Sequence, residues 1–352
     1  MSNSTSFTVV RRKPEHDNQI NELYAGIFGQ DSLEQSLKRW EWQYLENPSI
    51  GESGPAIWVA LDGEVVLGQL ATMEFPMWWG QQEVRASVAM DYMVRESARG
   101  RGVGMALAEA WLKNVDVGLG LGLTPSSHAL FKKSMTDVGP VSSYLKVLDV
   151  RKYVCRRWGV FLGTLATPFV KLVLGLAPAP VAGMSEIEVR TVSNFSKEYD
   201  DLWLRVRGSY AAIVKRDSNY LNWRYICCPF HSYCVHEARV KGVLAGYAVT
   251  RTQGERDFRR GIIVDLLCDA HDVATQRLLI DTVLNSFRRD GSARAETYCF
   301  DSRLARSLQQ HGFRRGRTGM QYTVSHRGVS SEPLTRQSEW SLTLGDGDLD
   351  RA

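Results

Sequence analysis

The sequence predicts a mixed α/β fold that is built twice along one chain, and three observations support this expectation. Strand and helix patterns alternate over residues 7–150, and a similar order returns over 187–324. The same Trp-x-Tyr-x-x-x-Pro signature precedes a hairpin in each half, at Trp42-Gln-Tyr44 and at Trp223-Arg-Tyr225. An apolar segment separates the halves. We therefore expect a tandem duplication joined by a linker helix.

The first half begins with a strand at Phe7–Arg11 and a helix that starts at Asp17, where apolar residues follow helical spacing. Asp62-Gly63 is a two-residue hairpin signal between strands at 57–61 and 65–74. A long strand at 84–94, a glycine loop and a helix follow. A strand at 117–123, a short helix at 126–133 and a strand at 144–150 complete this half.

The second half repeats this order with different residues. Its strands are expected at 187–192, 233–240, 243–250, 260–267, 295–300 and 318–324, and its helices at 195–207, 274–287 and 303–311. Gly312 follows the last helix, and glycine is the residue that most often ends a helix.

These patterns predict a first domain at 1–152, an apolar linker helix at 153–184, a second domain at 185–326 and a disordered tail at 327–352. Residues 158–183 are apolar over nearly transmembrane length, but Pro168 and Lys171 stand in the middle. We favour a packed linker helix, with peripheral membrane contact through 158–183 and a true membrane span as the alternatives. The tail ends in an acidic run, which is typical of a solvated segment.

The glycine loop joins the long strand to the following helix and reads Arg99-x-x-Gly102-x-Gly104. Two glycines let the backbone turn sharply and approach a ligand closely. The unpaired amides at the helix start, with the positive end of its dipole, favour an anion. The pattern predicts a pyrophosphate cradle, and an ordinary strand–helix turn is the alternative.

The stretch Arg99-Gly-Arg-Gly-Val-Gly104 resembles the coenzyme-A-binding motif of the GNAT N-acyltransferase superfamily. By resemblance, Arg99, Gly100, Arg101, Gly102, Val103 and Gly104 bind the coenzyme pyrophosphate. The backbone of Met93 and Val94 would pair with the pantetheine arm, because the strand splays from its neighbour in that family. The resemblance covers roughly residues 7–150.

The family resemblance implies an acyl-CoA-dependent N-acyltransferase that uses acetyl-CoA or another acyl-CoA as co-substrate, with no metal. The expected partner is a small-molecule amine, such as an amino sugar. The alternative is a non-catalytic scaffold or sensor that binds coenzyme A without transferring an acyl group.

Asp91 is the candidate catalytic residue, because an acidic residue in an apolar strand must be paired, exposed or in a cleft. It could accept the amine proton, or it could be structural. Glu74 and Glu83 are the next candidates. Many GNAT enzymes have a tyrosine as general acid where this chain has Phe131, which has no proton to donate; His128 lies nearby.

The second half departs from the motif. Its strand at 260–267 is followed by Cys268-Asp269-Ala-His-Asp272, which contains no glycine. Asp269 and Asp272 would repel a pyrophosphate. We therefore expect this degenerate half to bind no coenzyme A and to form a wall of the acceptor cleft.

Charge and cysteine content bound the remaining possibilities. The net charge is +4, and no Lys/Arg run is interleaved with aromatics, so the sequence gives no reason to expect nucleic-acid binding. Six cysteines occur without metal-ligand spacing. Free thiols in a reducing cytoplasm are the simplest interpretation.

Overall fold

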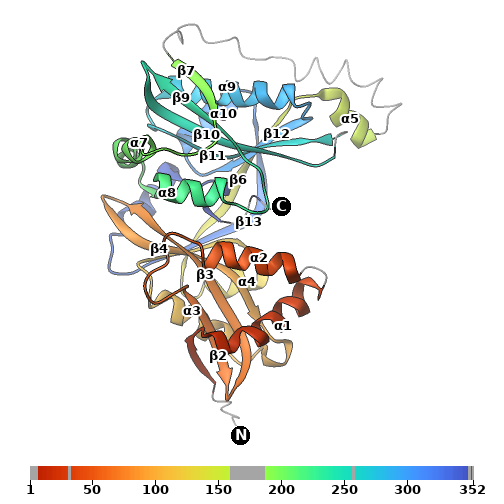
Figure 1. The fold of residues 1–352 in the computed structure, drawn as a ribbon, viewed down its shortest axis with the longest axis vertical. Coiled ribbons are helices and arrows are strands. Elements are labelled where there is room, and N and C mark those ends of the chain that lie inside the picture. The colour runs from red at the N-terminus through yellow and green to blue at the C-terminus, as the bar shows by residue number, and fades with distance from the viewer. Residues whose placement is uncertain (1–6, 31–32, 159–186, 256–257, 348–349, 351–352) are drawn as a thin grey trace. The chain divides into compact units, whose positions relative to one another are not determined.

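The computed structural model describes residues 7–30, 33–158, 187–255, 258–347 and 350, and it confirms the mixed α/β class (Figure 1). The chain forms two compact units. Unit 1 contains residues 1–140, 228–230 and 320–331, and unit 2 contains residues 141–227, 231–319 and 332–352. Each unit is described separately below.

Unit 1 is built on a mixed sheet in the order β1-β2-β3-β4-β5-β13. Neighbours are antiparallel except β4 and β5, which are parallel. The strands are β1 (Thr8–Arg11), β2 (Ile57–Asp62), β3 (Val65–Trp79), β4 (Gln82–Val94), β5 (Val117–Leu123) and the end of β13 (Arg314–His326). The helices are α1 (Asp17–Phe28), α2 (Leu33–Tyr44), α3 (Val103–Leu112) and α4 (Pro125–Phe131).

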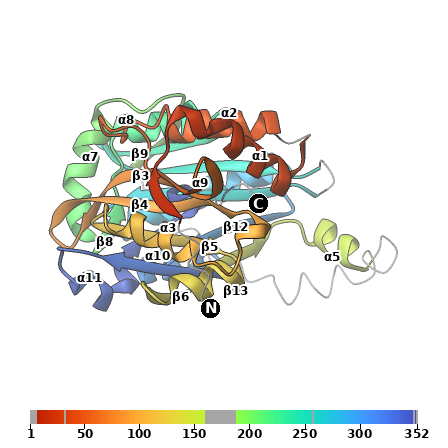
Figure 2. The same cartoon turned by 90° about the horizontal axis from the view of Figure 1, so that it is seen from below.

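Helices cover both faces of the unit 1 sheet (Figures 1 and 2). One apolar core joins α1 and α2 to the sheet through residues such as Tyr24 and Met93. The other joins α3 and α4 to the opposite face through Leu107, Trp111 and Phe131. The side chains of β4 therefore alternate between two different environments.

Unit 2 has the strand order β6-β12-β11-β10-β9-β7, and β14 pairs with β8. Its strands are β6 (Thr136–Val147, from residue 141), β7 (Ile187–Val192), β8 (Ala212–Val214), β9 (Cys234–Val240), β10 (Val243–Gln253), β11 (Arg260–Cys268), β12 (Arg294–Cys299) and β14 (Trp340–Ser341). Its helices are α5 (Val150–Trp158), α7 (Glu198–Val206), α8 (Ser218–Leu221), α9 (Val273–Arg289), α10 (Ser302–Gln310) and α11 (Glu332–Thr335).

The final strand of each half is assigned to the other unit. Of the strand expected at 144–150, residues 144–147 belong to β6, which pairs with β12 of unit 2, whereas Val150 begins α5. The strand expected at 318–324 is part of β13, whose residues Gln321–His326 pair with β5 of unit 1. The compact units are therefore not the continuous segments 1–152 and 185–326.

The expectation of a disordered tail from residue 327 is wrong for the described residues. Trp340 is fully buried, and Asp346 and Asp350 are also buried within unit 2. Asp346 forms an ion pair with Arg216, and Asp350 forms one with Arg224. Asp346 and Asp350 are buried because their carboxylates neutralise buried guanidinium groups, which would be costly to leave unpaired.

The expected linker helix lies almost entirely outside the described residues, since only α5, which ends at Trp158, is described. Among the helices in the described ranges, none is long and apolar enough to cross a membrane. All six cysteines are free thiols.

The two units repeat one piece of strand register. In unit 1 the pair Gly68-Gln69 lies opposite Met93-Val94, and in unit 2 Gly246-Tyr247 lies opposite Leu267-Cys268. Both glycines are required by close packing. A Cβ on Gly68 would lie 2.6 Å from the Met93 carbonyl oxygen, and one on Gly246 would lie 2.7 Å from that of Leu267.

This register makes Asp265 the counterpart of Asp91. Asp91 lies two residues before Met93, which faces Gln69, and Asp265 lies two residues before Leu267, which faces Tyr247. β4 and β11 each contain one extra, bulged residue close to the aspartate. Tyr44 and Tyr225 of the shared signature each donate a hydrogen bond to the aspartate of their own unit, at 2.6 and 3.0 Å. The Trp and Tyr of the signature are therefore buried in both units, whereas its prolines, Pro48 and Pro229, are exposed.

Candidate active site

The parallel strands of unit 1 separate after a short paired region. β4 and β5 pair only at Ala86–Val117, Ser87–Gly118 and Val88–Leu119, although β4 continues to Val94 and β5 to Leu123. Beyond Val88, none of the described strands pairs with the side of β4 that faces away from β3. The sequence resemblance implies a splay at Met93 and Val94, and a role for this opening in binding coenzyme A stays a prediction.

The glycine loop carries the chain from the end of β4 into α3. Gly100 and Gly102 have φ values of 80° and 83°, which L-residues with side chains rarely adopt. Gly102 is the residue before α3, so no side chain caps the first helical amides. Such a helix start is suited to a phosphate group.

Gly104 has a packing constraint in addition to the role that the sequence resemblance implies. A Cβ at this position would lie 2.1 Å from the hydroxyl oxygen of Tyr92. The phenol of Tyr92 therefore lies against the first turn of α3, where a larger residue would exclude it. Gly104 is glycine because a side chain packs there.

Tyr92 also stacks on Phe131, with ring centroids 5.7 Å apart and an interplanar angle of 22°. Phe131 itself is fully buried. Burial raises the pKa of Tyr92 to about 12, so its hydroxyl stays protonated at neutral pH. Sequence reasoning missed this residue, because it sought a phenol only at position 131.

The two loop arginines have different surroundings. Arg101 donates a 2.8 Å hydrogen bond to Asp62. Arg99 is exposed, and its nearest carboxylate is that of Glu96 at 3.7 Å. Arg99 is thus the more available positive charge beside the start of α3.

Asp91 lies on the opposite face of the sheet from Tyr92, toward α1 and α2. Its Oδ2 accepts hydrogen bonds from the hydroxyls of Tyr24 at 2.7 Å and Tyr44 at 2.6 Å. Its Oδ1 accepts one from Arg39 Nη2 at 2.8 Å, and only 5 % of the Asp91 side chain is exposed. Its φ of 40° is left-handed, which aspartate tolerates better than most residues.

Burial and the Asp91 carboxylate both raise the pKa values of Tyr24 and Tyr44, so both remain neutral donors. Burial lowers the pKa of Arg39, but Asp91, Tyr44 and Tyr24 together raise it by more, so the net shift of this pKa is upward. The three donors Tyr24, Arg39 and Tyr44 form charge-assisted hydrogen bonds with the Asp91 carboxylate.

Glu74 and Glu83 do not join this cluster. Glu74 lies opposite Ser87, whose hydroxyl accepts a hydrogen bond from Trp111 of α3, so Glu74 faces the α3 side. Burial raises the pKa of Glu74, while Arg11 opposes that shift. Glu83 lies near the exposed start of β4. His128 faces Asp137, with Nε2 at 3.3 Å from the carboxylate.

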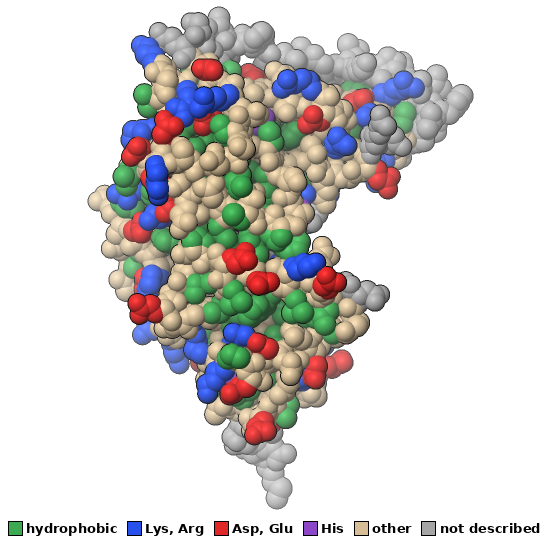
Figure 3. All heavy atoms as spheres, viewed as in Figure 1, with side chains coloured by type: hydrophobic (Ala, Val, Ile, Leu, Met, Phe, Trp, Pro, Cys, Tyr) green, Lys and Arg blue, Asp and Glu red, His purple; other side chains and the backbone are tan. Residues whose placement is uncertain are grey.

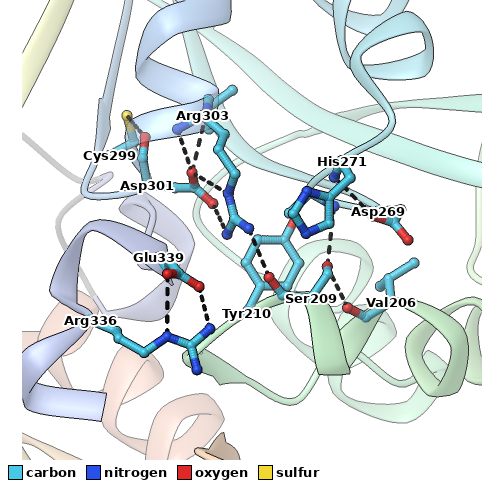
Figure 4. A network of polar contacts seen from close by, with 12 residues as sticks. Val206, Ser209, Tyr210, Asp269, His271, Cys299, Asp301, Arg303, Arg336 and Glu339 are labelled. Carbon is cyan, nitrogen blue, oxygen red and sulfur yellow. Dashed lines mark hydrogen bonds and ion pairs between the residues drawn. The ribbon is translucent and has the colours of Figure 1, made fainter. Parts of the chain in front are cut away.

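The corresponding helix start in unit 2 is closed. Asp272 precedes α9, and its carboxylate accepts hydrogen bonds from the amide and hydroxyl of Thr275 at 3.0 and 2.7 Å. Hydrogen bonds also fix the preceding loop. The Asp269 carboxylate accepts one from the amide of His271, and the Ser209 hydroxyl accepts one from the amide of Ala270 (Figure 4). A carboxylate thus occupies the position that α3 leaves open.

The surface carries mixed charge on the face in Figure 3, where Lys and Arg are interspersed with Asp and Glu. Within the described ranges, no group of three or more His, Cys, Asp or Glu side chains could hold a metal ion.

No protein-family model and no curated protein matches this sequence. Solved structures do match. A GCN5-related N-acetyltransferase from Anabaena variabilis matches with a TM-score of 0.63 and 14 % identity, over 91 % of this chain and 72 % of that chain. A probable N-acyltransferase from Enterococcus faecalis gives 0.61 and 11 %, over 90 % and 72 %.

Another matching structure is the N-myristoyltransferase of Saccharomyces cerevisiae with bound myristoyl-CoA. Its TM-score is 0.53 and its identity 9 %, over 96 % of this chain and 89 % of that chain. At these identities the likeness is one of fold, and it confirms the fold that the glycine-loop resemblance implies.

Proposed function

We propose that this chain, which has the fold of the GCN5-related N-acetyltransferases, is an acyl-CoA-dependent N-acyltransferase that acylates a small-molecule amine. One observation carries the proposal. The parallel pair β4–β5 opens after three residue pairs, toward a glycine-rich helix start that no side chain caps. An extended thioester arm fits the first feature and a pyrophosphate the second. Six free thiols suit a cytoplasmic setting.

In the proposed reaction the amine nitrogen bonds to the thioester carbon, and the carbon–sulfur bond then breaks. The sulfur leaves with the bonding electrons and takes up a proton to give free coenzyme A. The nitrogen loses one proton as the amide forms. The backbone of Met93 and Val94 would bind the arm, and Gly100 to Gly104, with Arg99, would bind the pyrophosphate.

Asp91 remains the proposed catalytic carboxylate, with a role shaped by its contacts. Its carboxylate accepts hydrogen bonds from three donors and would orient the acceptor amine, whose proton would pass to the carboxylate directly or through water. The second half is proposed to be a degenerate copy, because Asp272 already caps α9.

Acetyl-CoA should raise the melting temperature of the full chain, because a ligand that binds only the folded state stabilises it. Free thiol should then appear when acetyl-CoA is mixed with a panel of primary amines. Longer acyl-CoA species belong in the same assay. Stabilisation without thiol release from any acyl-CoA would favour the non-catalytic scaffold, for which the buried Phe131 is the supporting observation.

Tyr92 is proposed to donate the proton to the leaving sulfur, in place of a tyrosine at position 131. Tyr92→Phe keeps the stacking on Phe131 and the fit against Gly104 but removes the hydroxyl. We expect kcat to fall about 10²-fold, near the lower end for a lost acid because a thiolate leaves readily. Acetyl-CoA affinity should not change.

With a pKa of about 12, Tyr92 is protonated throughout pH 6–10, so the Tyr92→Phe defect should be constant over that range. An unchanged kcat in Tyr92→Phe, or a defect that appears only in acetyl-CoA binding, would remove Tyr92 from the chemistry.

A further inference from the structure

In each unit the aspartate pairs with an arginine, and the two arginines differ in the number of carboxylates that they contact. In unit 2, Arg216 Nε donates to Asp265 at 2.9 Å, and its Nη2 donates to Asp346 at 2.5 Å. Its Nη1 donates to the carbonyl of Val214 at 3.2 Å, so all three nitrogens are used. The side chain of Arg216 is fully buried.

The second carboxylate on Arg216 comes from the segment that follows β14. Asp346 also accepts a 2.7 Å hydrogen bond from the amide of Thr343, which fixes the carboxylate in place. Gly345 packs against the hydroxyl of Tyr225, since a Cβ there would lie 2.0 Å from that oxygen. The chain's own segment around Gly345 and Asp346 therefore fills the space beside Arg216 and Tyr225.

In unit 1 the arginine that pairs with the aspartate is Arg39, and it contacts one carboxylate of the described residues. Arg39 Nη2 donates to Asp91 at 2.8 Å, and the described residues provide no second carboxylate for its Nε and Nη1. Of the Arg39 side chain, 12 % is exposed, whereas that of Arg216 is fully buried. A guanidinium carries five N–H donors in a planar fork and pairs best with a carboxylate in two parallel bonds.

The equivalence of the two aspartates rests on strand register and not on the arginines, which lie at different distances before their signature tyrosines. Asp91 and Asp265 hold matching positions in β4 and β11, and each bonds to a tyrosine of the shared signature. Unit 2 shows that an arginine bound to this aspartate can bind a second carboxylate, since Arg216 donates to both Asp265 and Asp346.

We propose that Arg39 binds a carboxylate of the acceptor, so that the acceptor is an amine that also carries a carboxylate, such as an amino acid. The inference rests on the proposed acyl transfer. Arg39 would donate hydrogen bonds to the acceptor carboxylate, as Arg216 donates to Asp346. Asp91 would be held on the other side of the guanidinium, near the amine.

The acylated product provides a probe that does not depend on turnover. N-acetylglycine carries an acylated nitrogen next to a carboxylate, and N-acetylglycinamide is its uncharged match. With coenzyme A present, N-acetylglycine should raise the melting temperature of the full chain and N-acetylglycinamide should not. Arg39→Gln can still donate to Asp91 but loses the charge, and it should weaken N-acetylglycine binding about 10- to 100-fold.

Arg39→Lys keeps a positive charge and serves if Arg39→Gln fails to fold; it should bind N-acetylglycine more weakly than the unchanged chain. Equal shifts from the acid and the amide, no shift from N-acetylglycine, or full binding by both variants would overturn the inference. The melting shift with acetyl-CoA alone reports separately on the proposed function. If that shift is present while the acid shows none, only the carboxylate assignment fails.

Discussion

Asp91→Asn is expected to slow amine acylation about 10²–10⁴-fold, the range typical of a lost general base, while acetyl-CoA still binds. The substitution keeps the size of the side chain but removes its charge. The defect should shrink at high pH, where more of the amine is already deprotonated. Steady-state rates between pH 6 and 10, with acetyl-CoA affinity measured in parallel, test this expectation.

The same substitution also leaves Arg39 without its carboxylate in a largely buried place. Removing one partner of a buried pair costs about 3–5 kcal/mol, and the partial exposure of Arg39 makes the lower part of that range the expected cost in urea unfolding. Asp265→Asn is the matched control: it removes the equivalent buried carboxylate from Arg216, Tyr225 and Tyr247. It should destabilise the protein without changing turnover per folded molecule.

Three outcomes would change the assignment of Asp91. A folded Asp91→Asn protein with normal turnover would exclude it as base and as essential contact, and Glu74 would become the next candidate. An equal loss of turnover in Asp265→Asn would mean that the defect follows from stability. Failure of Asp91→Asn to fold would make the residue structural.

Gly102→Val is expected to abolish the stabilisation by acetyl-CoA, which amounts to about 2.7 kcal/mol at a ligand concentration of 100 Kd. Gly102 has a φ of 83°, which a β-branched residue strongly disfavours. The new side chain would also stand before the open amides of α3. Thermal unfolding with and without acetyl-CoA measures the loss directly.

Replacing both Gly102 and Gly104 should have the same effect, but Gly104→Val also collides with Tyr92 and therefore tests packing as well. The control lies in unit 2. Asp269→Asn with Asp272→Asn should leave the acetyl-CoA shift unchanged, since asparagine also caps a helix. A full shift in Gly102→Val would show that the cradle is misplaced, and a lost shift in the unit 2 control would reveal a second coenzyme site.

The fold and the glycine loop could be predicted from the sequence because their signals are local. Helical spacing in α1 and α3, the Asp62-Gly63 turn and the glycines before α3 each depend on a few neighbouring residues. Asp91 was also recognised locally, as an acidic residue in an apolar strand. Its partners were not, because Tyr24, Arg39 and Tyr44 lie 47 to 67 residues away.

The failures share a cause in long-range pairing. The acidic tail has the composition of a solvated segment, and nothing local indicates that Arg216 and Arg224, more than 120 residues away, neutralise it. The phenol of Tyr92 was missed because its contact with Phe131 depends on how β4 and α4 pack. A search for any tyrosine near the aligned position would have included it.

The pairing of β5 with β13 has a consequence for how the protein is made. β5 (Val117–Leu123) can pair with β13 only after Gln321–His326 has been synthesised, about two hundred residues later. Until that point the unit 1 sheet lacks its last strand. Until then β5 is an unpaired edge, which is a template for association with other chains. Contacts so distant in sequence also fold slowly. A fragment that ends near residue 152 would keep the glycine loop and lose this strand, so we expect it to aggregate in the cell.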